Sequence, residues 1–119
     1  MRTISLLKSD LMKALISALI LILILTFQVY CAFAQDYEKY MEEWNDKREL
    51  ATKYLLEAEE DLKIGNKASS CEKQRKAGTY GIKATKSLME AMKLNGSTYG
   101  LENIESGLRK WEELRDFCG

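Results

Sequence analysis

The sequence predicts an all-α protein: an antiparallel three-helix bundle that runs up, down and up behind an amino-terminal signal peptide. Three observations lead to this prediction. An almost wholly apolar run lies near the start of the chain, apolar residues then recur at helical spacing, and no stretch alternates at period two for long enough to form a convincing strand. At 119 residues the chain has room for one folded domain.

Residues 1–34 have the features of a signal peptide. A positive region made of Arg2, Lys8 and Lys13 precedes an apolar run at residues 14–29. Ala32 and Ala34 flank Phe33 in the small-x-small pattern that a signal peptidase cleaves, so we predict cleavage after Ala34. The alternative is an uncleaved membrane anchor, because the apolar run approaches the roughly 20 residues of a spanning helix.

The charge balance argues against nucleic acid and anionic membranes as partners. Residues 1–34 hold three of the 18 basic residues and one of the 18 acidic residues, which leaves 15 bases and 17 acids in residues 35–119. Nucleic acids and anionic membrane surfaces both call for a basic face. We therefore expect no nucleic-acid partner, and membrane contact only if the signal segment is retained.

The cysteines predict a disulfide and an exported protein. Cys31 leaves with the signal segment, so Cys71 and Cys118 remain as an even pair. Residues 35–119 are few for a single hydrophobic core, so a crosslink would add needed stability. A disulfide between Cys71 and Cys118 closes a long loop of the chain and contributes about 4 kcal/mol to the free energy of unfolding in the chain-entropy model. We expect a periplasmic or secreted location. No metal site or cofactor is expected, since the chain has no His and keeps only two Cys.

Within the domain at residues 35–119 we predict helices at about 36–64, 70–94 and 100–118. Gly65 and Gly96 stand where left-handed carboxyl-terminal caps belong. Ser69 and Glu72 have the spacing of a capping box, which places the start of the second helix at about residue 70.

Short connections make neighbouring helices antiparallel, so Cys71 and Cys118 are expected at the same end of the bundle. Counting inward from this pair sets Gly78 opposite Trp111 and Gly81 opposite Leu108. Large residues would then meet small ones, which explains why glycines are found inside a helix.

The best candidates for a partner contact lie at the end of the bundle away from the disulfide. They are four aromatic or methionine residues of the first helix: Tyr37, Tyr40, Met41 and Trp44. Such residues are enriched at adaptable binding surfaces, although the same spacing also suits a core. The first helix is expected to extend beyond the third, which would leave part of this segment uncovered.

No catalytic constellation is recognisable, because no His or nucleophile with a nearby base accompanies the carboxylates. The chain is therefore predicted not to be an enzyme. We expect a small exported protein that binds another protein or itself, such as an inhibitor, an immunity protein or an accessory subunit. The alternative is a helical carrier of an apolar small molecule.

Overall fold

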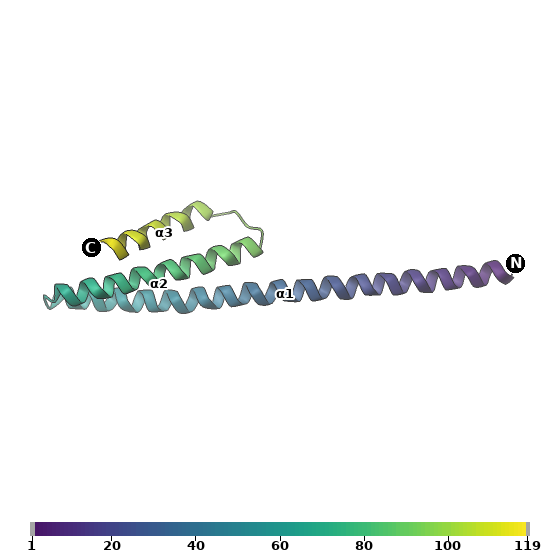
Figure 1. Cartoon of the computed structure of the whole chain (residues 1–119), viewed down its shortest axis with the longest axis horizontal. Coiled ribbons are helices and arrows are strands. Elements are labelled where there is room, and N and C mark those ends of the chain that lie inside the picture. Colours follow the sequence, from purple (N-terminus) through teal and green to yellow (C-terminus); the bar gives the residue numbers. More distant parts are fainter. Residues whose placement is uncertain (1, 119) are drawn as a thin grey trace. The chain divides into compact units, whose positions relative to one another are not determined.

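The computed structural model describes residues 2–118, with side chains from residue 8 onward. It has three α-helices: α1 (Arg2–Lys63), α2 (Lys67–Leu94) and α3 (Leu101–Asp116) (Figure 1). The residues described include no β-strand, so the predicted all-α class is confirmed. The chain divides into two units, Met1–Gln35 and Asp36–Gly119, and α1 contributes residues to both.

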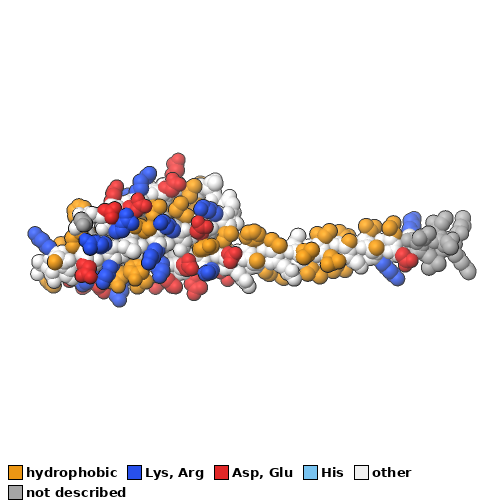
Figure 2. Space-filling model, viewed as in Figure 1, with side chains coloured by type: hydrophobic (Ala, Val, Ile, Leu, Met, Phe, Trp, Pro, Cys, Tyr) orange, Lys and Arg blue, Asp and Glu red, His pale blue; other side chains and the backbone are white. Residues whose placement is uncertain are grey.

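The first unit is a helical segment with an apolar surface. All side chains from residue 8 to residue 30 are exposed, including a continuous series of Leu and Ile between positions 19 and 25. Hydrophobic side chains dominate this segment in Figure 2, whereas charges of both signs are interspersed over the second unit. Among the described helices, α1 alone contains a stretch long and apolar enough to cross a membrane, a property that secretion signals share.

The first predicted helix, residues 36–64, proves to be the last part of α1, which ends at Lys63. The physical reason for the longer helix lies in the sequence, because residues 1–64 contain neither Gly nor Pro. Without a residue that breaks the backbone hydrogen bonding, helical structure continues through the predicted cleavage site.

Both predicted glycine caps are confirmed, and each closes its helix with the same pair of hydrogen bonds. Gly65 has φ +81°, and the amides of Gly65 and Asn66 donate to the carbonyls of Leu62 and Asp61 at 3.1 and 2.8 Å. Gly96 has φ +66°, and the matching bonds run from residues 96 and 97 to residues 93 and 92. This is the Schellman arrangement, which glycine favours because it has no Cβ.

The predicted start of the second helix is wrong by one turn. α2 begins at Lys67, and its cap is Asn66, whose side-chain oxygen accepts from the Ser69 amide at 3.2 Å. The Ser69 hydroxyl donates instead to Asp61 Oδ2, at 2.6 Å. The capping box does not form because Asn66 is an equally good cap and lies one turn closer to the glycine that ends α1.

Small residues form the interface between α1 and α2. They recur every seventh position at Ala51 and Ala58 of α1 and at Ser70, Ala77, Ala84 and Ala91 of α2, and all six are buried. The Ser70 hydroxyl donates to the Ala58 carbonyl at 2.8 Å, which joins the two small-residue rows directly. Short side chains of this kind allow helices to pack closely. The larger Leu55 is half-buried and Leu62 is exposed.

Ala77→Leu should therefore destabilise the α1–α2 pair. The Ala77 side chain is fully buried, and three added heavy atoms would force the helices apart at a cost of about 1–3 kcal/mol. Urea unfolding followed by circular dichroism measures the change. Ala68→Leu, at an exposed position in the first turn of α2, is the matched control. Equal stabilities for the two variants would contradict this interface.

α3 packs against α2 (Figure 1). The disulfide between Cys71 of α2 and Cys118, just beyond the end of α3, has its Cα atoms 5.7 Å apart. The Trp111 indole lies directly over Gly81, where an added Cβ would overlap the ring. A Cβ on Gly78 would come within 2.7 Å of the Arg115 backbone. Trp111 thus packs one turn further along α2 than predicted, on Gly81 and not on Gly78. No residue of α3 is fully buried, so this helix docks shallowly.

Candidate functional site

The four predicted partner-contact residues lie in the amino-terminal part of the second unit. Tyr37, Tyr40, Met41 and Trp44 are all half-buried. The Trp44 ring is also covered by Arg48 of the same helix, whose guanidinium carbon is 4.5 Å from the ring centroid. These four side chains therefore present less open apolar surface than their composition suggests, whereas Tyr99, in the connection between α2 and α3, is 92% exposed.

Three exposed apolar side chains of the second unit lie at the disulfide end, whereas Leu56 on α1 (57% exposed) and Tyr99 between α2 and α3 (92% exposed) lie elsewhere. Leu62 and Ile64, beside the turn that leads into α2, are 54% and 79% exposed. Phe117, next to the bonded Cys118, is 80% exposed. Folding leaves these large side chains in contact with water at one end of the domain, which is typical of surfaces that bind another molecule. We call Leu62, Ile64 and Phe117 the apolar tip.

Two of the shallow grooves beside the apolar tip share Gln74 of α2. The first has a volume of about 430 Å³, and its lining includes three leucines of α1: Leu55, Leu56 and Leu62. The second has a volume of about 390 Å³ and lies between Gln74 and four residues of α3 or its end: Lys110, Glu113, Leu114 and Phe117. Apolar surface from α1 and from α3 thus borders the same residue of α2.

Sequence reasoning did not identify the apolar tip. Leu62 has the helical spacing of the other apolar residues of the first helix, which by itself favours a core position, yet the structure leaves it exposed. Ile64 and Phe117 lie off the stripes that predict each core. One signal in the sequence could have indicated the apolar tip. Ile64 and Phe117 are large apolar residues that lie outside the apolar stripes, one beside a turn and the other near the end of the third helix.

A charged cluster fixes the turn between α1 and α2. Asp61 accepts from the Ser69 hydroxyl and lies 2.9 Å from the Lys73 ammonium, which also approaches Glu57 at 4.0 Å. The hydrogen bond from Ser69 and then the one from Lys73 hold the pKa of Asp61 below its ordinary value of 3.8, although burial acts in the opposite direction. The same partnership with Asp61 raises the pKa of Lys73 above 10.5. Acids of α1 thus pair with a base of α2 across the turn.

The Asp61 cluster should make the free energy of unfolding depend on pH in the acidic range. Because the pKa of Asp61 is lower in the folded chain than in the unfolded one, the ionised carboxylate stabilises the fold above about pH 4 and that contribution is lost as the pH falls through the folded-state pKa. Asp61→Asn should flatten this part of the stability profile, measured by urea unfolding between about pH 7 and pH 2. Asp46→Asn, at an exposed position of α1, is the control. An unchanged pH profile in Asp61→Asn would contradict the assignment.

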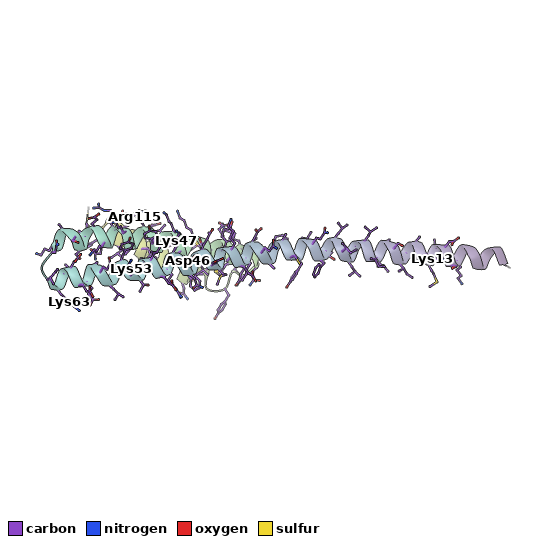
Figure 3. All side chains as sticks on the ribbon, turned by 90° about the horizontal axis from the view of Figure 1, so that it is seen from below. Lys13, Asp46, Lys47, Lys53, Lys63 and Arg115 are labelled. Atoms are coloured by element: carbon purple, nitrogen blue, oxygen red, sulfur yellow. A yellow bond between two sulfur atoms is a disulfide. The ribbon has the colours of Figure 1, made fainter. Side chains whose placement is uncertain are left out.

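A second cluster brings two tyrosines and three lysines together on one edge of the α1–α2 pair. The rings of Tyr54 (α1) and Tyr80 (α2) stack with centroids 5.7 Å apart and planes within 4° of parallel. Lys47 and Lys83 place their Nζ atoms 5.6 and 5.5 Å from the Tyr80 centroid, and Lys76 is 5.7 Å from that of Tyr54. Lys47, labelled on α1 in Figure 3, thus reaches across to α2. We call these five residues the tyrosine–lysine cluster.

Metal ligands do not cluster among the residues that the structure describes: no group of three or more His, Cys, Asp or Glu side chains could hold a metal ion. Of the described cysteines, Cys31 is unbonded and half-buried, and Cys71 and Cys118 are joined as the sequence predicts.

Comparison with known proteins adds no relative from which a function could be transferred. No protein-family model, no curated protein and no solved structure matches this chain.

Proposed function

We propose that the chain is exported and folds as an up-down-up three-helix bundle behind a cleaved signal peptide. Contacts that pair α1 with α2 in reverse order support this topology, because Ser70 bonds to Ala58 whereas Ser87 bonds to Glu43. The bond from Cys71, near the start of α2, to Cys118, beyond the end of α3, extends the same pattern to α3. The water-exposed apolar surface of residues 8–30 supports removal or membrane insertion of this segment.

An oxidising compartment, periplasmic or extracellular, is the proposed location. The disulfide supports it, because such bonds persist outside the reducing cytosol. If the first segment is retained, the same domain would be held at a membrane surface on the exported side.

We propose that the domain works without catalysis, by binding another protein. The observation that carries this proposal is the apolar tip. Leu62, Ile64 and Phe117 remain exposed to water, although a domain this small needs its large apolar residues for the core. Binding would remove this surface from water, at a gain of about 25 cal/mol for each Å² buried. An inhibitor, an immunity protein and an accessory subunit all act in this way.

The predicted aromatic end, with Tyr37, Tyr40, Met41 and Trp44, is the second proposed contact surface. Its half-buried side chains offer less free apolar area than the apolar tip does. A carrier of apolar small molecules is less well supported, because alanines fill the α1–α2 interface and the two grooves beside Gln74 are shallow and open.

Photo-crosslinking in the source cells tests this function. A photoreactive amino acid placed at Phe117 should give a discrete adduct, either with a protein partner or with a second copy of the chain. The same probe at Trp44 tests the aromatic end, and one at the exposed Lys53 serves as the control. Adducts from position 44 alone would move the contact to the aromatic end. No adduct above the control at either position would contradict the protein-binding role.

A further inference from the structure

The tyrosine–lysine cluster concentrates positive charge in a domain whose predicted mature form is slightly acidic. Lys47 and Lys83 both lie beside Tyr80, and neither forms an ion pair among the residues whose side chains are described. Lys76 approaches Glu72 at 3.6 Å, but both side chains are more than half exposed, so solvent weakens this pair.

The acids on the same edge are engaged elsewhere. Toward the α1–α2 turn, Glu57 and Asp61 face Lys73, and at the other end Glu43 accepts from the Ser87 hydroxyl at 3.3 Å. Lys47 and Lys83 are therefore left without a described acidic partner, and both ammonium groups lie beside the same ring, Tyr80. An anion bound beside this ring would be attracted by both charges.

Both helices of the pair contribute side chains to the cluster. The stacked rings come from two different helices, and the lysines lie over ring faces, where the aromatic quadrupole attracts a cation. Holding the lysine heads near the rings lowers the conformational entropy that a ligand would have to remove. Tyrosine hydroxyl groups add hydrogen-bond donors at the same place.

We propose that the tyrosine–lysine cluster binds a phosphate group that carries two negative charges. Such a group has the acceptor oxygens and the charge to engage the ammonium groups of Lys47 and Lys83 beside Tyr80. It could belong to a free phosphorylated compound or to the headgroup of an anionic lipid. The inference goes beyond the proposed protein-binding role, because the cluster shares no residue with the apolar tip or with the aromatic end.

Nuclear magnetic resonance of the tyrosine rings in the full chain, held in micelles of a non-ionic detergent, tests the proposal. One arm adds inorganic pyrophosphate, and the other replaces part of the detergent with phosphatidate. Saturable shifts of the Tyr54 and Tyr80 signals are expected in at least one arm at physiological ionic strength. Shifts with pyrophosphate indicate a soluble ligand, and shifts with phosphatidate alone indicate a lipid headgroup. No saturable shift in either arm would overturn the proposal.

Two double variants, each of which removes two lysine charges, provide the control. Lys47→Gln with Lys83→Gln should weaken binding at least about tenfold, equivalent to about 1.4 kcal/mol. Lys53→Gln with Lys86→Gln removes the same charge from exposed positions on the same helices and should change binding less than about twofold. Equal weakening by both pairs would show general charge attraction and overturn the site. If a melting curve shows that the first pair unfolds the domain, Lys83→Gln alone makes the same comparison against Lys86→Gln.

Discussion

Reduction of the Cys71–Cys118 disulfide should lower the free energy of unfolding by about 4 kcal/mol. The bond joins residues 47 positions apart, so its loss frees a long loop in the unfolded chain. In the folded state, the packing of α3 cannot make up for the lost disulfide, because no residue of α3 is fully buried. Urea unfolding with and without a dithiol reductant, followed by tryptophan fluorescence, measures the difference.

The loss should be greatest in α3. Hydrogen exchange should show that residues 101–116 lose protection on reduction, while the alanine-lined pair of α1 and α2 keeps it. The Cys71→Ser, Cys118→Ser double variant should match the reduced chain and respond to no reductant. Cys31→Ser, which removes the unbonded thiol, should leave the stability of the domain unchanged. A chain equally stable with and without reductant would contradict the structural role of the bond.

Gly81→Leu should destabilise the domain by about 1–3 kcal/mol or more, because its side chain would occupy the space of the Trp111 indole. The indole cannot move toward α2, so α3 must shift outward as a whole. Urea unfolding gives the size of the effect. In chains that also carry Trp44→Phe, a red shift of the emission would show that Trp111, the remaining tryptophan, has become more exposed.

Gly107→Ala is the matched control for this prediction. Gly107 also lies inside a helix, but a Cβ there would meet no atom within 4 Å. Alanine favours the helix, so this variant should be more stable than the natural chain by about 0.5–1 kcal/mol. A Gly81→Leu variant that unfolds at the same urea concentration as the natural chain would contradict the packing of Trp111 on Gly81.

The helices, their glycine caps and the disulfide could be predicted because local signals determine them. Gly65 and Gly96 stop the helices wherever their neighbours lie, and the pairing of Cys71 with Cys118 needs only helices joined by short turns. The start of α2 was mispredicted by one turn, because Asn66 and Ser69 are competing caps and only the structure shows which of them accepts the amide hydrogen bond.

The side-chain register was harder to predict. Counting from the disulfide placed Trp111 on Gly78, yet a disulfide fixes two Cα atoms only within a range of separations, and the ring settles one turn away, over Gly81. Leu62 shares the helical spacing of Ala51 and Ala58, yet Leu62 is exposed while the two alanines are buried. Apolar spacing alone does not show which residues of a stripe a neighbouring helix covers.

The most direct test of an exported, disulfide-linked bundle is mass spectrometry of the chain recovered from the source cells, digested without reduction. We expect the chain to begin at Gln35 and to give one crosslinked peptide that contains both Cys71 and Cys118. Recovery of both cysteines as free thiols, on a chain that still carries residues 1–34 and remains in the cytosol, would contradict this description of the protein.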